Sequence, residues 1–205
     1  MSLAASAGAA PIPDLTTLPQ ATGAAATGRI WFVSKQGGKV GVLDPKTKHI
    51  GVLRTGKQIE NSFAVDRDAV YIVSDRRMYW FSYKNGKPRV DWPVAYENSG
   101  IHESSQVDAV SGTTPTIVSG GYVAIADNAD PMNVVVYRTA IKPMGKRTVC
   151  AVPVFAKGAG ATENWLIGSG RSLIVQNKYA GIAVAPDASL NVGVIGGLVR
   201  LADAR

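Results

Sequence analysis

The sequence has one cysteine, only two histidines and no long apolar run among its 205 residues. A lone cysteine excludes an intramolecular disulfide. Cys150 lies in the alternating stretch KRTVCAVPVF, which predicts a small buried strand residue and not a reactive thiolate, because a thiolate needs a basic, exposed setting. No stretch approaches the roughly 18 uncharged apolar residues that a spanning helix requires, so no membrane span is expected.

Helical patterns of 10 to 15 residues are also missing. The composition, 46% hydrophobic and 18% charged, suits a soluble domain with a real core. The 22 glycines and 11 prolines supply turns at short intervals, which is typical of an all-β protein.

The first 28 residues contain no lysine or arginine and are rich in Ala, Gly, Thr and Pro. A secretory signal begins with basic residues and continues into an apolar core, and this segment has neither. We therefore expect a flexible leader over residues 1–28 and the folded part over residues 29–205.

The net charge of +7 raises the question of an anionic partner. Nucleic-acid binding calls for clustered cations interleaved with aromatic platforms. Here the cations are spread along the chain, and most of them fall at expected turns. The pattern favours a solvated basic face, and no nucleic-acid partner is predicted.

A repeat organises the chain. The β-rich runs RIWFVSK, AVYIVSD, GYVAIAD and RSLIVQ recur at steps of about 40 to 50 residues. After each of the first three comes a second strand and a turn, of which Asn85-Gly86 is a strong hairpin signal. Before each of the last three lies a segment that turns from polar to apolar: ENSFAVD, GTTPTIVSG and TENWLIGSG.

Four strands per unit at this period predict a β-propeller with about four four-stranded blades. That number makes either a small propeller or part of a larger one. An open blade exposes apolar faces and strand edges, so we expect closure by missing chain or by self-association. The apolar segment AGIAVAPDASLNVGVIGGLV is expected to supply an outer or closing strand.

Polar residues stand at the entries to the expected innermost strands, which point into a propeller's central channel. We predict a ring of acids and amides there, and its metal-ligand candidates are Glu60, Asn61, Asp127, Asn128, Glu163 and Asn164. Carboxylate and amide oxygens are the ligands of a hard cation, Ca²⁺ above all. The alternative is that these side chains cap backbone amides in Asx-turns.

At these residues the chain resembles a known superfamily. ENSFAVDRDAVYIVSD is similar to the blade pattern of the gluconolactonase, strictosidine-synthase-like and paraoxonase-like propellers, and IADN is similar to their Asp-Asn calcium pair. The turns DPKTKH and KNGKP also resemble quinoprotein-like propellers. The lactonase resemblance implies a calcium ion that polarises a lactone or ester carbonyl and activates water. Together with the Ala-rich leader, it implies a periplasmic or secreted protein.

Two functions therefore follow from the sequence. The first is a calcium-assisted hydrolase of a small molecule, for which His102, on a polar linker, is the candidate general base. The second is a non-catalytic propeller that binds a ligand or a protein. The four tryptophans, Trp31, Trp80, Trp92 and Trp165, recur in strands, and packing between blades is predicted for them.

Overall fold

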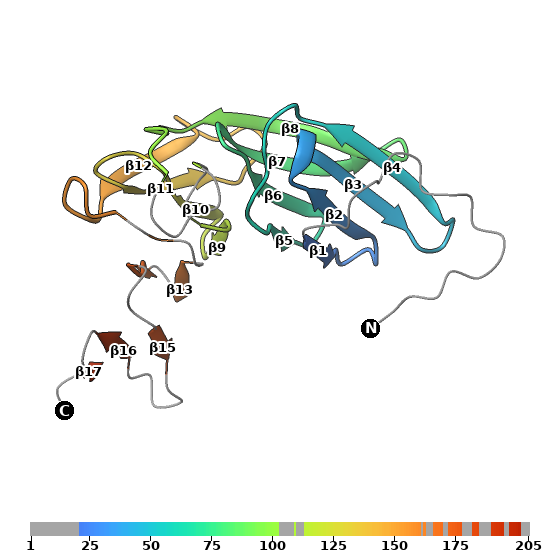
Figure 1. Ribbon diagram of the computed structural model, residues 1–205. Helices are drawn as coiled ribbons and strands as arrows, with labels where there is room; N and C mark the ends of the chain where they lie inside the picture. Colours follow the sequence, from blue (N-terminus) through green and yellow to red (C-terminus); the bar gives the residue numbers. More distant parts are fainter. Residues whose placement is uncertain are drawn as a thin grey trace. The chain divides into compact units, whose positions relative to one another are not determined.

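The structure is a computed structural model, and it describes residues 21–102, 109, 113–160, 162, 166–169, 172–177, 182–184, 190–194 and 197–201. The elements in these residues are β-strands and a single three-residue 3₁₀ turn, η1 (Gln36–Gly38) (Figure 1). No helix within them is long and apolar enough to cross a membrane. The predicted all-β class is confirmed.

The first sheet is a four-stranded antiparallel meander. Its strands follow one another in chain order: β1 (Ala21–Ala24), β2 (Ile30–Ser34), β3 (Lys39–Asp44) and β4 (His49–Arg54). This is the strand order of a propeller blade. Strand β1 lies inside the predicted leader and pairs with β2, so the folded part reaches back to Ala21 and the expected boundary after residue 28 is corrected.

The second sheet repeats this meander. It consists of β5 (Ala64–Asp66), β6 (Ala69–Val73), β7 (Arg77–Lys84) and β8 (Lys87–Ala95). The turn between β7 and β8 is Asn85-Gly86, with φ of 49° and 82°. A type I′ turn needs positive φ at both central residues, so the hairpin predicted at this pair is confirmed.

The third sheet has the same order, and the chain continues into shorter sheets. The third sheet contains β9 (Thr116–Val118), β10 (Tyr122–Ala126), β11 (Asn133–Arg138) and β12 (Thr148–Pro153). Next come a pair, β13 (Ile167–Ser169) and β14 (Ser172–Ile174), and a three-stranded sheet, β15 (Ile182–Val184), β16 (Leu190–Val194) and β17 (Gly197–Leu201). Three consecutive blade meanders confirm the propeller class. The C-terminal apolar segment forms three strands of one sheet, where a single outer strand was expected.

Strand β12 is the edge of the third sheet, and its exposure overturns one expectation. All residues from Val149 to Pro153 are exposed, including Cys150, which was predicted to be buried. The alternating pattern correctly predicted a strand. Burial depends on what covers an edge strand's faces, which the pattern does not encode.

The chain divides into two units, residues 1–94 and 95–205. The core of the first unit lies between its two sheets. Because alternate side chains share one face of a strand, each strand contributes residues two positions apart. The main contributors are Trp31 and Val33, Val40 and Val42, Val70 and Ile72, and Tyr79 and Phe81.

The core of the second unit joins the third sheet to the β13–β14 pair. Its buried residues include Ala124 and Ala126 of β10, Val134 of β11, and Leu166, which directly precedes β13. The hydroxyl of Thr116 donates a hydrogen bond of 3.0 Å to the Leu166 carbonyl. This bond fixes the entry to β13 against β9.

The described tryptophans are packed in the first unit. Trp31 is 1% exposed in the core between the two sheets, which confirms its predicted packing between blades. Trp80 and Trp92 form an aromatic cluster with Tyr71, with ring centroids 6.3 Å apart in each pair. Trp165 lies outside the described residues.

Close backbone approach between the first two sheets generates the first prediction. A Cβ atom at Gly51 would lie 2.0 Å from the Gly86 carbonyl oxygen, and the neighbouring His49 ring donates a 3.0 Å hydrogen bond to that oxygen. Gly51→Ala should lower the free energy of unfolding by about 1–3 kcal/mol, because backbone must move to admit the methyl group. Urea denaturation measures this, with the exposed-site variant Val149→Ala as control. An unchanged Gly51→Ala midpoint would contradict the described approach.

Candidate functional site

The predicted site residues lie on two kinds of connection. One kind leads into the first strand of a sheet, and the other joins its second and third strands. In an antiparallel meander both stand at the same end of the sheet. In the second unit these connections carry Glu97 to His102 and Asp127 to Met132, respectively.

Asp127 is 1% exposed, and its carboxylate is used within its own loop. One oxygen accepts hydrogen bonds from the backbone amides of Asn133, at 2.7 Å, and Ala129, at 3.2 Å. The other accepts a 2.9 Å bond from the Asn133 carboxamide. Burial raises the pKa of Asp127, the hydrogen bonds from Asn133 and Ala129 oppose the rise, and the charge of Glu97 adds to it.

Asn128 ties this loop to the incoming connection. Its carboxamide nitrogen donates to the Asn98 side-chain oxygen, at 3.1 Å, and to the Ile101 carbonyl, at 2.9 Å. The Ser99 amide donates in return to the Asn128 carbonyl, at 2.7 Å. Asp127 thus caps backbone amides, as the sequence's alternative interpretation expects, whereas Asn128 donates to oxygens of the incoming connection. Calcium binding by the pair stays a prediction.

His102, the candidate base, directly follows the residue held by Asn128. Its side chain is exposed, as is that of Ile101. Within the described part of the chain, no three His, Cys, Asp or Glu side chains are close enough together to hold a metal ion. A catalytic role for His102 stays a prediction.

In the first unit, Glu60 and Asn61 lie on the connection between β4 and β5, and both are half-buried. The Glu60 carboxylate is 3.9 Å from the Lys35 ammonium group, in the connection between β2 and β3. Glu163 and Asn164 lie outside the described residues. A ring that joins all six metal candidates therefore stays a prediction.

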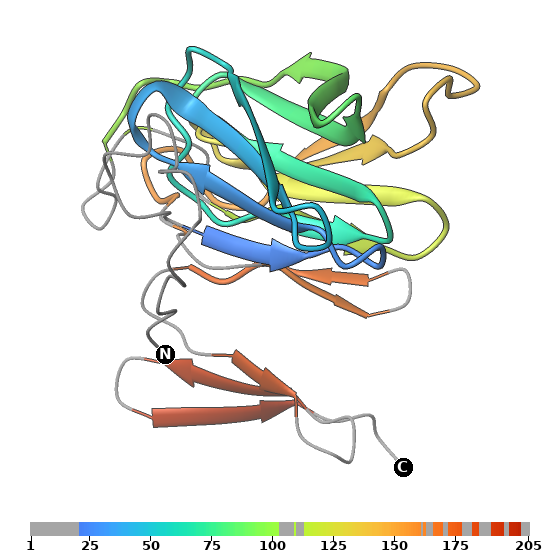
Figure 2. The same ribbon diagram turned by 90° about the vertical axis from the view of Figure 1, so that its right-hand side faces the viewer.

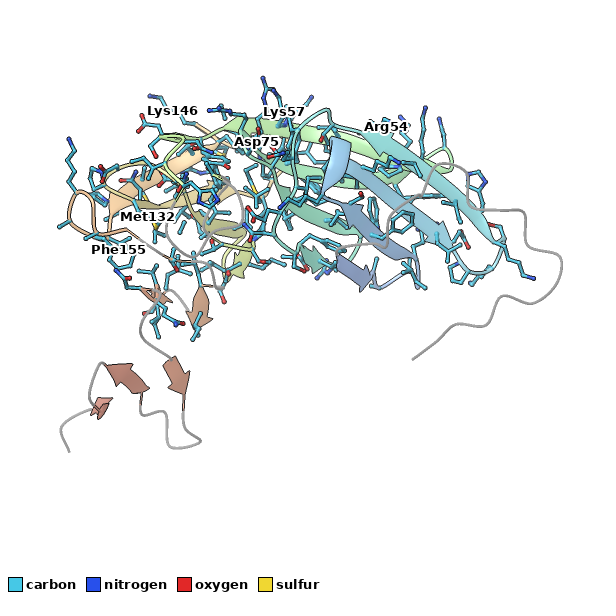
Figure 3. All side chains as sticks on the ribbon, in the orientation of Figure 1. Arg54, Lys57, Asp75, Met132, Lys146 and Phe155 are labelled. Carbon is cyan, nitrogen blue, oxygen red and sulfur yellow. The ribbon has the colours of Figure 1, made fainter. Side chains whose placement is uncertain are left out.

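The structure brings together a set of cations that the sequence scatters. Three connections at one end of the first two sheets are hydrogen-bonded to one another: the Thr55 amide donates to the Gly38 carbonyl, and the Asp75 amide donates to the Gln58 carbonyl, both at 2.9 Å. These connections and the strand ends beside them carry six cations, here named the basic loop surface: Lys35, Lys39, Arg54, Lys57, Arg76 and Arg77. Figure 3 labels Arg54, Lys57 and Asp75 of this region.

The same connections carry two acids, Glu60 and Asp75. Both are more buried than the cations they pair with: Glu60 with Lys35 at 3.9 Å and Asp75 with Arg76 at 3.9 Å. Arg54, Lys57 and Arg77 are exposed. The sequence could have predicted this surface from the positions of the cations alone. They flank turns that a meander brings to the same end of the sheet.

Solved structures that are similar to this chain include the following two. The WD40 domain of Neurospora crassa Pan2 is 14% identical, with a TM-score of 0.49 over 85% of this chain and 45% of that one. An auxiliary nutrient binding protein from Bacteroides thetaiotaomicron VPI-5482 is 15% identical, with a TM-score of 0.43 over 84% and 44%. The chain thus spans less than half the length of either. No protein-family model and no curated protein matches it.

The roles of Asp127 generate two predictions. Asp127→Ala leaves two backbone amides and a carboxamide without their acceptor, so the free energy of unfolding should fall by about 2–4 kcal/mol. The loss should be the same with and without millimolar calcium, as followed by urea denaturation. The exposed variant Asp68→Ala is the control. A loss that appears only when calcium is present would contradict the fastening role.

Asp127→Asn tests the electrostatics of the same position. Burial raises the folded-state pKa above the ordinary value of 3.8, so the folded protein binds this proton more tightly than the unfolded chain. The resulting stabilisation is fully present below pH 3.8 and is lost as pH rises through the folded-state pKa. Wild type should therefore lose stability relative to Asp127→Asn as the pH rises above 3.8. Parallel urea titrations measure the difference, and an opposite slope would exclude the raised pKa.

Proposed function

We propose that the protein is a non-catalytic propeller that binds an acidic segment of a partner protein through the basic loop surface. The observation that carries this proposal is the convergence of six cations on three connections and the strand ends beside them, where the middle connection is hydrogen-bonded to each of the other two. The two acids among them lie beside Lys35 and Arg76, and Arg54, Lys57 and Arg77 are exposed to solvent.

Ordered backbone supports a binding role for this surface. The Thr55 hydroxyl donates to the Gly38 carbonyl at 3.0 Å, in addition to the backbone bonds between the connections. Cations held on ordered loops lose less conformational entropy on binding than cations on a flexible tail. The exposed positions also imply contacts that are individually weak and sensitive to salt.

The chemistry of the surface favours a protein over a nucleic acid. Single-stranded nucleic acids bind where bases stack on aromatic side chains beside the cations. The connections 35–38, 55–63 and 74–76 contain one aromatic residue, Phe63, and it packs against the core of the first unit. The carboxylates of glutamate and aspartate need no aromatic partner. The guanidinium group of arginine and the ammonium group of lysine are sufficient to bind them.

The calcium-assisted hydrolase is the competing proposal, and it rests on the resemblance to lactonase propellers. It needs ligand oxygens that are available to an ion. Both oxygens of Asp127 accept bonds from its own loop, and the Asn128 carboxamide nitrogen is bonded to the incoming connection. The hydrolase would therefore draw its ligands from Asn61, Glu163, Asn164 and the Asn128 carboxamide oxygen.

A peptide titration tests the proposed function. A fluorescent peptide of ten Glu and Gly residues should bind wild type, and the triple variant Arg54→Glu, Lys57→Glu, Arg77→Glu should bind it at least tenfold more weakly. The matched control reverses three exposed cations at the other end of the same sheets, Lys46→Glu, Lys84→Glu and Lys87→Glu, and should change affinity less than threefold. Fluorescence anisotropy at low and high salt gives both values.

Three outcomes would overturn the proposal: no binding, equal losses in the two triple variants, or tighter binding of a single-stranded oligonucleotide of equal charge. The melting temperature with Ca²⁺ and with EDTA separates the competing function. It should be the same in both conditions, whereas a calcium-dependent rise that Glu163→Gln removes would favour the hydrolase.

A further inference from the structure

The connection between β11 and β12 exposes apolar side chains at the end of a hairpin. It comprises residues 139–147, TAIKPMGKR, and in Figure 2, where it is coloured gold, it extends past the ends of both strands. Met144 is 93% exposed and Ile141 is 59% exposed. Exposing two large apolar side chains to water on one loop is unfavourable in free energy unless a lipid surface or a partner covers them.

Arginine side chains hold this connection in shape. The Arg147 guanidinium donates to three carbonyls: that of Arg138 at the end of β11, at 2.7 Å, and those of Ala140 and, at 2.9 Å, Ile141 in the loop. Arg138 donates in the other direction, to the Lys146 carbonyl at 2.6 Å. Gly145 has a φ of 85°, which a left-handed turn at the tip requires. The apolar tip is thus displayed by an ordered loop.

The charges around the tip all have one sign. Lys142 and Lys146 are exposed on either side of Met144, and residues 138–147 contain no acid. Lysine side chains can keep the ammonium group in water or among phosphates while the apolar stem lies against hydrocarbon. Apolar tips flanked by lysines are the arrangement of segments that rest in the interface of an anionic bilayer.

We infer that this hairpin tip, hereafter the β11–β12 tip, is a peripheral contact for an anionic lipid surface. Met144 and Ile141 enter the boundary between headgroups and acyl chains, and Lys142 and Lys146 lie among the anionic headgroups. The size of the tip favours a bilayer over a protein partner. A stable protein interface takes roughly 20–30 residues a side, whereas a bilayer accepts a few side chains without a complementary pocket.

Vesicle sedimentation with the full chain tests the inference. Wild type should pellet with vesicles of phosphatidylcholine and phosphatidylserine at 70:30 and at least tenfold less with phosphatidylcholine alone. Ile141→Ser with Met144→Ser, and separately Lys142→Gln with Lys146→Gln, should each reduce partitioning at least tenfold. Ile101→Ser and the pair Lys84→Gln, Lys87→Gln are matched controls at exposed positions elsewhere, and they should bind as wild type does.

A second readout reports insertion itself. In a Cys150→Ser background, an environment-sensitive dye on Met144→Cys should shift to the blue with anionic vesicles, while the same dye on Ile101→Cys should not. Equal binding to both lipid mixtures, or full binding by the Ile141→Ser, Met144→Ser variant, would overturn the inference. Loss of vesicle binding only in the Arg54→Glu, Lys57→Glu, Arg77→Glu variant would assign the lipid contact to the basic loop surface and also overturn it.

Discussion

One recurring interaction organises each blade: the connection between the second and third strands is hydrogen-bonded to a connection that joins neighbouring blades. Thr55 and Gly38 make this contact at the first sheet, Asp75 and Gln58 at the second, and Asn128 with the 98–101 segment at the third. A four-stranded meander has no covalent link between these loops, so the bonds set how the chain enters each sheet. These hydrogen bonds also limit which polar groups can bind a ligand. A group that bonds one loop to another could bind a ligand only by giving up that bond, which would destabilise the blade.

The blade repeat was readable because each of its parts has a local cause. The alternating runs fix strands, and Asn85-Gly86 fixes a turn type through positive φ. Strand β1 escaped prediction because Ala-Thr-Gly-Ala carries almost no strand preference of its own, and its conformation comes from pairing with β2. The exposure of Cys150 escaped for the opposite reason. Its local pattern is that of a good strand, but burial is decided by what packs on the edge of a sheet.

The sequence predicted which residues lie at the candidate site, but it predicted only part of what their side chains do. The sequence placed Asp127 and Asn128 at the entry to an innermost strand, whereas the structure has them in the connection between β10 and β11, at the same end of the sheet. Both capping and metal binding were consistent with those residue types. The capping bonds come largely from Asn133, six residues further on, whose backbone amide and carboxamide both donate to Asp127, and the local sequence pattern does not show this contact. The cations were harder to read, because Lys35, Arg54 and Arg76 are about 20 residues apart. Two strands of a meander return the chain to the same end, which turns that spacing into proximity.

The two ends of a sheet are therefore under different constraints. At the end that joins blades, side chains such as Asp127 hold the fold from buried positions, so a recognition surface there has to be built from exposed side chains, such as Arg54, Lys57 and Arg77 of the basic loop surface. At the other end, the hairpin turns of the first two sheets are joined by the bond between His49 and Gly86, whereas the β11–β12 turn is held by its own arginines, as the Arg147 contacts show. Such a turn can change length or residues without disturbing the entry of the next blade. The β11–β12 tip lies at this end and is long, apolar and basic, although the fold requires only a tight turn there. A feature that the fold does not require is a good candidate for a binding role.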